Sequence, residues 1–288
     1  MRSAGDRGHR LRFGVVAPPM FMGWEEVSAW FRAADRAGLD AGFVVDHFLS
    51  DIDGFEGDEG VTLEVWSLLG ALAAATDRLH IGPYVASVTH RLPGVLAKAA
   101  ATVDHISHGR LILGVGAGWH EREHAAYGIP FPSPRERVDL FAEAMEIIRR
   151  LETEDRATFE GRHASVTDAP FEPKPARGHI PVLVGSRGKR MMRYVARYAD
   201  YWDLPSRLDG LPEMEERFLR MCDAEGRDPD DIVWVHEEVS PTAWDDLEDR
   251  VAVLAPQGIS FFLVGVRHGD DPGVLERVAP VIERLRRA

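Results

Sequence analysis

Short apolar runs alternate with longer amphipathic stretches along almost the whole chain, and this alternation limits the possible folds more than any other feature. Several short runs are almost continuously apolar, as strands are when helices cover both faces of a parallel sheet. Strands are predicted at residues 11–17, 42–46, 79–85, 111–116, 181–185, 201–204, 232–236 and 259–264. Helices are predicted at residues 24–37, 64–75, 93–108, 134–151, 189–198, 212–225, 244–255 and 273–287. The pattern therefore indicates an α/β protein.

Eight strand–helix units in 288 residues favour a (β/α)8 TIM barrel. A doubly wound open sheet is the alternative, because it also consists of parallel strands covered by helices. The interval between the fourth and fifth strands, residues 117–180, is the longest and is rich in proline, so an insertion is predicted there. No linker-like segment divides the chain. We therefore expect a single domain at residues 11–288 after a flexible N-terminus at residues 1–10.

The composition limits the partners that this chain can bind. Its 34 basic and 47 acidic residues give a net charge of −13, whereas nucleic acids and anionic membranes attract positive surfaces. The single cysteine, Cys222, excludes an intramolecular disulfide and a cysteine-rich metal site. No apolar run reaches the roughly 18 residues needed to cross a bilayer, and residues 13–17 are too short for the core of a signal peptide. We therefore expect a cytoplasmic protein that acts on a small molecule.

Residues 120–124 read His-Glu-Arg-Glu-His and formally match the zinc-hydrolase signature H-E-x-x-H. On a helix, this spacing places His120 and His124 on one face with a carboxylate between them. The helix would be short, however, because Gly128 and Pro130 follow closely, and the extended form of the signature is absent. A zinc hydrolase is therefore kept as an alternative of another class, and no metal ligand is predicted.

A glycine-rich basic segment, residues 185–193, connects the predicted fifth strand to the next helix. Small residues leave backbone N–H groups accessible, and N–H groups at the start of a helix bind phosphate. Four cationic side chains fall within residues 187–193, and Ser186 and Arg187 add a hydroxyl group and a charge close to the strand. The sequence therefore predicts a phosphate site in this segment, and a basic, solvated helix face is the alternative.

Two other predicted strands end in residues suited to chemistry or ligand binding, and barrel enzymes place their catalytic groups at such ends. Asp46 and His47 end the second strand, and His47 can act as a hydrogen-bond donor or proton carrier near neutral pH. A purely structural Asp–His pair is the alternative. Gly116 and Gly118, at the end of the fourth strand, allow close backbone packing and the approach of a flat ligand.

A series of short motifs covers residues 11–203 in a specific order and spacing. They lie at residues 45–48 (VDHF), 82–85 (GPYV), 91–93 (RLP), 96–98 (LAK), 101–111 (ATVDHISHGRL), 113–119 (LGVGAGW), 136–137 (ER), 184–188 (VGSRG) and 196–200 (ARYAD). Together they resemble the bacterial luciferase-like monooxygenase superfamily, particularly its branch that uses the deazaflavin coenzyme F420.

This resemblance implies a (β/α)8 barrel with a flavin or deazaflavin at the C-terminal mouth. It implies that the peptide bond between Tyr84 and Val85 is a non-proline cis bond, that this bond lies behind the cofactor ring, and that Ala86 lies next to it. It also implies that Asp46 and His47 lie beside the ring, and that the cofactor phosphate binds at residues 185–188. Where some deazaflavin enzymes carry a carboxylic acid, this chain has Trp119, so His120 or Glu121 would have to replace that acid.

The expected function is therefore hydride transfer between F420 and a small organic substrate. His47 is the expected proton partner, and Trp119 and Trp202 are expected to form apolar walls. A monooxygenase that uses reduced FMN and O2 is the alternative within the same fold, and it would need a dry pocket. A cofactor-binding protein without turnover is a further alternative. The resemblance also implies a homodimer.

Overall fold

The computed structural model describes residues 8–50, 60–186, 188–240 and 242–287. Arg187 and the first seven residues of the predicted N-terminus lie outside the described residues. Within the described ranges, we find no helix that combines the length and the apolarity needed to cross a bilayer.

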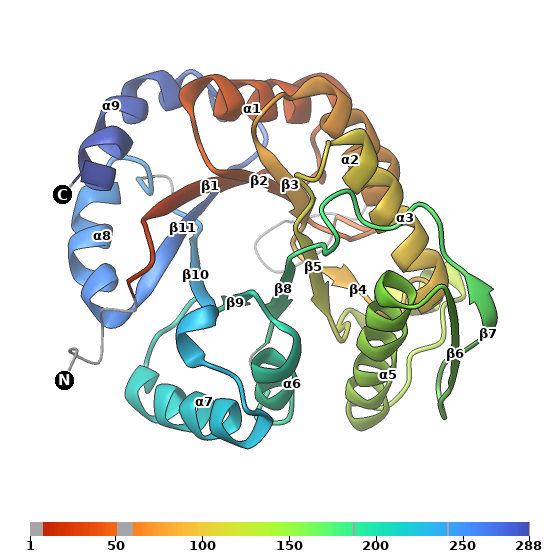
Figure 1. Cartoon of the computed structure of the whole chain (residues 1–288). Helices are drawn as coiled ribbons and strands as arrows, with labels where there is room; N and C mark the ends of the chain where they lie inside the picture. Colours follow the sequence, from red (N-terminus) through yellow and green to blue (C-terminus); the bar gives the residue numbers. More distant parts are fainter. Residues whose placement is uncertain (1–7, 51–59, 187, 241, 288) are drawn as a thin grey trace.

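Parallel strands form a nearly closed barrel with helices around it (Figure 1). The strands are β1 (Arg12–Val16), β2 (Ala41–Val44), β3 (His80–Pro83), β4 (Ala86–Ser87), β5 (Leu113–Gly116), β8 (Val182–Gly185), β9 (Tyr201–Asp203), β10 (Val233–Glu238) and β11 (Ile259–Gly265). Their order in the sheet is β3-β2-β1-β11-β10-β9-β8-β5-β4. The predicted TIM barrel is confirmed.

The third barrel strand is divided into two pieces, so the described residues form nine strands in this sheet rather than eight. The sequence predicts one strand over residues 79–85, but β3 ends at Pro83 and β4 begins at Ala86. These two pieces are the two ends of the sheet order. A bridge from Ile81 to Leu111 and the pairing of β4 with β5 bring the ends together around the barrel.

In the part of the chain that the structure describes, eight helices follow the barrel strands in turn. They are α1 (Trp24–Ala37), α2 (Val65–Ala75), α3 (Pro93–Ile106), α5 (Pro134–Thr153), α6 (Met191–Tyr198), α7 (Leu211–Glu225), α8 (Leu247–Leu254) and α9 (Val274–Arg287). Local chemistry sets several ends: Ser133 and Glu136 form a capping box at the start of α5, and Gly38 ends α1 with a left-handed backbone. Short 3-10 turns lie at Pro229–Asp231 and Ala255–Gln257.

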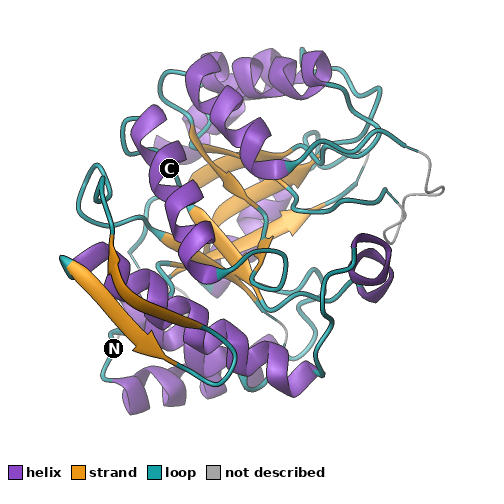
Figure 2. Ribbon diagram, turned by 90° about the vertical axis from the view of Figure 1, so that its right-hand side faces the viewer, coloured by secondary structure: helices purple, strands orange, loops and turns teal. Residues whose placement is uncertain are grey.

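Three elements besides the regular barrel helix occupy the long interval between β5 and β8. The short helix α4 (Glu121–Tyr127) follows β5, and the antiparallel strands β6 (Arg156–Glu160) and β7 (Ser165–Pro170) follow α5. Figure 2 shows this hairpin outside the barrel. Because α4 begins close to the end of β5, its first turn lies near the C-terminal mouth of the barrel.

Apolar side chains fill both faces of the sheet, as expected for strands between a packed interior and outer helices. A smaller buried cluster, which includes Phe43, Leu183, Val235 and Phe261, comes from strand residues that alternate with those of the larger cluster. The larger cluster packs the opposite strand faces against the helices. Because side chains fill both faces of the sheet, we expect the chemistry at the loops that follow the strand ends.

Candidate active site

A cleft of about 740 Å³ lies where the C-terminal ends of the barrel strands meet, and its volume is typical of small-molecule and cofactor sites. It is lined by Val45, Asp46, His47, Tyr84, Val85, Ser87, His90, Gly116, Ala117, Gly118, Trp119, His120, Glu123, His124, Gly185, Ser186, Gly188, Met191, Asp203, Leu204, Ser206 and Glu237. The cleft therefore joins the loops after β2, β3, β5, β8 and β9, as in barrel enzymes generally.

The peptide bond between Tyr84 and Val85 is cis, as the resemblance implied. This bulge packs closely against β5, because a Cβ atom at Gly114 would lie 2.0 Å from the carbonyl oxygen of Pro83. Tyr84 donates a hydrogen bond from its hydroxyl group to Asp203, at the end of β9 on the opposite side of the mouth. The bulge is thus held in the cleft wall by β5 and by β9.

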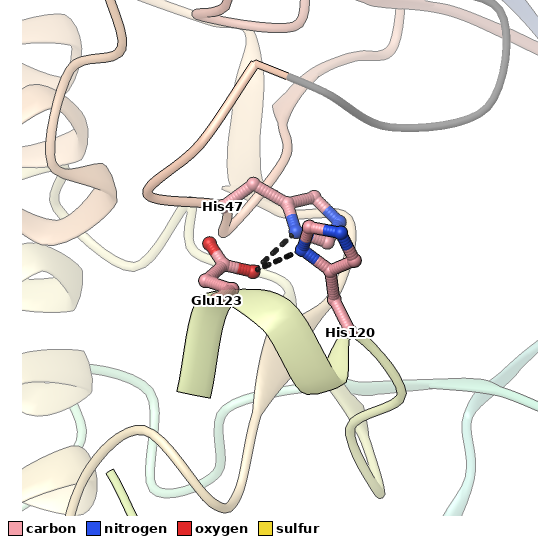
Figure 3. Close-up of side chains that lie close together, drawn as sticks. All are labelled: His47, His120 and Glu123. Atoms are coloured by element: carbon pink, nitrogen blue, oxygen red, sulfur yellow. Dashed lines mark hydrogen bonds and ion pairs between the residues drawn. The ribbon is translucent and has the colours of Figure 1, made fainter. Parts of the chain in front are cut away.

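His47, Glu123 and His120 form a compact cluster at one side of the cleft (Figure 3). Nδ1 of His47 lies 2.8 Å from Oε2 of Glu123, and Nδ1 of His120 lies 3.3 Å from the same oxygen. The two imidazole rings are nearly perpendicular, with their centroids 5.8 Å apart. The strand end after β2 and the first turn of α4 thus meet at one carboxylate.

Glu123 was not predicted as a site residue, yet its carboxylate is the centre of this cluster. Its side chain is completely buried, and Oε1 accepts a hydrogen bond from the backbone amide of Phe48. Burial alone would raise the pKa of Glu123, but the hydrogen bonds from His47 and the Phe48 amide lower it below its ordinary value. Glu123 is therefore an ionised, acceptor-only group inside the protein.

Trp119 lies at the rim of this cluster, where the structure leaves 56% of the residue exposed. Its ring contacts His47 edge-on at 5.5 Å and His120 at 5.0 Å. Trp119 therefore lines the cleft beside both histidines. Trp202, the other predicted wall, packs instead in the core between Phe218 and Trp234.

Asp46 lines the cleft, but protein groups bind both of its oxygens. Arg91 contacts Oδ2 at 2.7 Å and Oδ1 at 3.1 Å, and the Ser87 amide donates to Oδ2. Burial alone would raise the pKa of Asp46, whereas His90 and Arg91 lower it. Asp46 is therefore an ionised carboxylate that fixes the segment after the cis bond.

The H-E-x-x-H motif does not direct its two histidines at one point. Both ring nitrogens of His124 have partners within the protein: Nδ1 donates to the carbonyl oxygen of His120 at 2.8 Å, and Nε2 lies 2.6 Å from Thr89 Oγ1. Burial lowers the pKa of His124. In the described part of the chain, His120 is grouped instead with His47 and Glu123. The geometry therefore disfavours the zinc-hydrolase hypothesis.

The loop from β8 to α6 brings Gly185, Ser186 and Gly188 to the cleft, and a Cβ atom at Gly185 would lie 3.3 Å from the side chain of Val85. The basic residues that follow are directed elsewhere: Arg190 pairs with Asp139 at 2.7 Å, and Arg193 pairs with Glu225 at 2.6 Å. The expected gathering of cations at the mouth is therefore wrong for these two side chains. Helix α6 also begins at residue 191 rather than at residue 189.

Most of the predicted site residues line the one cleft. They are His47, Trp119, His120, Asp46, Tyr84, Val85, Gly116, Gly118, Gly185, Ser186 and Gly188. Ala86 is completely buried in the core, because its side chain points to the helix side of β4. Glu121, considered as a replacement acid, is exposed on α4. Arg187 lies outside the described residues.

Comparison with known proteins identifies the family. The model of the luciferase-like monooxygenase family matches residues 10–257. The chain therefore belongs to this family, and it is an enzyme of the oxidoreductase or monooxygenase type.

Two relatives illustrate its neighbourhood within the family. An uncharacterized protein of Mycobacterium tuberculosis is 35% identical over 227 residues, which cover 78% of this chain and 75% of the relative. An F420-dependent glucose-6-phosphate dehydrogenase of Microbacterium testaceum is 33% identical over 228 residues, which cover 77% of this chain and 66% of the relative.

Solved structures share the fold at low sequence identity. An F420-dependent secondary alcohol dehydrogenase in complex with an F420–acetone adduct has a TM-score of 0.80 and 18% identity, with 96% of this chain and 99% of that chain covered. A type II Baeyer–Villiger monooxygenase from Pseudomonas putida in complex with FMN has a TM-score of 0.77 and 16% identity, with 97% and 99% covered. The same barrel thus occurs in structures with either cofactor.

Proposed function

We propose that this enzyme transfers a hydride between coenzyme F420 and a small organic substrate. The observation that carries the proposal is that the cis bond at Tyr84–Val85 and the loop at Ser186 line the same cleft. The relative from Microbacterium testaceum, which is 33% identical and is named an F420-dependent dehydrogenase, supports the choice of a deazaflavin as cofactor.

The residues of the cleft suit a flat ring with an anionic tail. Val45, Val85 and Ala117 supply apolar surface, and Tyr84 lies next to Val85 in the wall. Gly118 has no room for a side chain, because a Cβ atom there would lie 2.5 Å from Ser87 Oγ. In this proposal the cofactor ring lies against the cis bond. Asp46 and His47 lie on one side of the ring, and Gly116 and Gly118 lie on the other.

The phosphate end is assigned to the loop after β8. Gly185 and Gly188 have no side chain to cover the backbone, and Ser186 adds a hydroxyl group. Arg187, which lies outside the described residues, is included as the charged partner predicted from the sequence. When bound, a deazaflavin would supply two-electron hydride chemistry, which amino-acid side chains lack.

The protein's own residues supply a proton partner and a cover for the substrate. His47 lines the cleft beside Trp119 and is held by Glu123, so its imidazole can exchange a proton with a substrate atom. Trp119 excludes water from one side. We do not propose glucose 6-phosphate as the substrate, because Trp119 stands where the resemblance implies that some deazaflavin enzymes have a carboxylic acid.

A monooxygenase that uses reduced FMN is the second candidate, and the shared fold with an FMN-bound enzyme favours it. Titration of the purified protein with oxidised F420 and, separately, with FMN distinguishes the two. Quenching of deazaflavin fluorescence should report saturable F420 binding, with FMN binding much more weakly. Tight binding of FMN together with no binding of F420 would contradict the proposal.

We further propose that the protein works in the cytoplasm as a homodimer, with one domain at residues 11–288 and without nucleic-acid or membrane partners. The acidic composition and the single cysteine support this setting. Light scattering on the purified protein measures the mass, and a mass of one chain would contradict the dimer.

A further inference from the structure

Glu123 connects two imidazole rings that come from distant parts of the chain. His47 follows β2, whereas His120 precedes α4, and both Nδ1 atoms lie within 3.3 Å of the same oxygen, Oε2. In Figure 3, dashed lines join one nitrogen of each ring to a single oxygen of Glu123. Glu123 is completely buried, and both histidines line the cleft. A buried carboxylate thus orients two side chains that a substrate can reach.

The hydrogen bond at Oε1 of Glu123 determines whether Oε2 donates or accepts. Oε1 accepts a hydrogen bond from the Phe48 amide, which can only donate. The carboxylate is ionised, because the pKa of Glu123 is lowered despite its burial by hydrogen bonds from His47 and the Phe48 amide. Oε2 can therefore only accept, so Nδ1 of His47 must carry a hydrogen atom. In a neutral imidazole, the lone pair is then on Nε2.

We propose that Glu123 is a positioning residue that holds His47 in the Nδ1–H tautomer, so that Nε2 of His47 accepts the proton of a substrate hydroxyl group. The inference rests on the proposed function for the oxidant, an oxidised deazaflavin. In the oxidation of an alcohol, the C–H bond gives its hydride to this oxidant and the O–H bond gives its proton to Nε2. A carbonyl group forms, and the electrons and protons balance. His120 provides the second hydrogen bond to the same carboxylate oxygen.

A metal site made by the same three side chains is the competing explanation. Their ligand atoms lie within 4.8 Å of one another, which a metal ion could bridge. Coordination through Nδ1 would require both imidazoles to lack hydrogen there, whereas hydrogen bonding to Oε2 requires hydrogen on both. The tautomer of His47 therefore separates the two explanations.

Nitrogen-15 NMR of histidine-labelled protein without cofactor measures this tautomer directly. Spectra of the variants His47→Asn and His120→Asn assign the two signals. The expected result is a His47 signal with hydrogen on Nδ1 and a lone pair on Nε2. A wild-type His47 with hydrogen on Nε2, or about one equivalent of metal that His47→Asn removes, would overturn the proposal.

The variant Glu123→Gln reverses the expected tautomer. The amide oxygen of the new side chain must face the Phe48 amide, which places its NH2 group against Nδ1 of His47. Nδ1 must then accept, and the hydrogen atom moves to Nε2. The matched control is Glu121→Gln, which removes the same charge from an exposed position of the same helix and should leave the tautomer unchanged. If Glu123→Gln does not fold, the wild-type spectrum still decides.

Failure of this inference can be told from failure of the proposed function. The NMR measurement uses no cofactor, so it stands even if F420 does not bind. If F420 binds, Glu123→Gln should keep the wild-type Kd and lower kcat for alcohol oxidation by about 100-fold, the size of general-base catalysis. An unchanged kcat together with a reversed tautomer would refute the catalytic part alone.

Discussion

Arg91 binds the buried carboxylate of Asp46 at two points, with Nη1 2.7 Å from Oδ2 and Nη2 3.1 Å from Oδ1. Asp46 follows β2 and Arg91 precedes α3, so the pair fastens the strand end that carries His47 to the segment that follows the cis bond. Asp46 thus has a structural task in addition to its place in the cleft wall. The sequence placed Asp46 at the site but did not reveal this partner.

Removal of Arg91 should be costly, because it leaves the Asp46 carboxylate buried without its cation. Arg91→Met is expected to lower the free energy of unfolding by about 3 kcal/mol, the usual effect of breaking a buried ion pair. Urea denaturation measures the change. Glu64→Gln is the control, since it removes the second, half-exposed carboxylate on Arg91 and keeps an oxygen to cap α2. Equal losses in the two variants would show that the buried pair has no special role.

Gly118 should tolerate a side chain less well than Gly128, although both have a left-handed backbone, with φ of +82° and +66°. A Cβ atom at Gly118 would lie 2.5 Å from Ser87 Oγ and 2.7 Å from Thr89 Oγ1, whereas nothing lies within 4 Å of one at Gly128. Gly128→Ala should cost about 1 kcal/mol from backbone strain, and Gly118→Ala should cost at least about 2 kcal/mol. Thermal unfolding of both variants compares them, and equal costs would show that the contacts at Gly118 relax freely.

His179 should stabilise the fold in a pH-dependent way. Its ring binds Asp200 at 3.1 Å and Glu152 at 3.3 Å, and these hydrogen bonds raise its pKa from 6.5 to about 10. Because the folded value is the higher one, the stabilisation is complete below pH 6.5 and is lost as the pH rises through about 10.

The variant His179→Gln tests this dependence by urea denaturation across that range. The side chain is 54% exposed, so solvent screening limits the expected loss to about 1 kcal/mol or less at the acidic end. Wild type and variant should converge above about pH 10. A difference that grows with pH would contradict the assigned cause.

Ser186 should contribute to cofactor binding through its hydroxyl group. Loss of one hydrogen bond to a charged group usually costs about 1.5 kcal/mol or more, so Ser186→Ala should weaken F420 binding about tenfold. Arg193→Gln is the control, because Arg193 is paired with Glu225 on α7 and should not affect affinity. A larger effect of Arg193→Gln on the fluorescence titration would move the phosphate site away from Ser186.

The barrel was predictable because its signal is local and repeated. The apolar pattern of each segment predicts a strand or a helix without reference to the rest of the chain. The predicted segments differ from the observed elements mainly at their ends. The division of the third strand is different, since residues 79–85 are continuous in pattern. Only the resemblance to a family, and no property of Tyr84 or Val85 alone, indicated the cis bond.

The candidate site was predictable only where its residues follow strand ends. His47, Gly116 and Ser186 stand at such ends, so the barrel itself brings them together. Glu123 was missed because its importance depends on the fold: spacing along α4 relates it to His120, but no sequence pattern shows that His47 meets it. Likewise, the acids that neutralise Arg190 and Arg193 lie on other helices.

The central claim is that one ligand spans the cleft, with its ring against Tyr84–Val85 and its phosphate at Ser186. A crystal structure of the protein soaked with F420 tests this most directly. We predict density for the tricyclic ring in contact with Val85 and for a phosphate group within hydrogen-bond distance of Ser186. Density for F420 elsewhere on the protein, or for the phosphate at another strand end, would contradict the account.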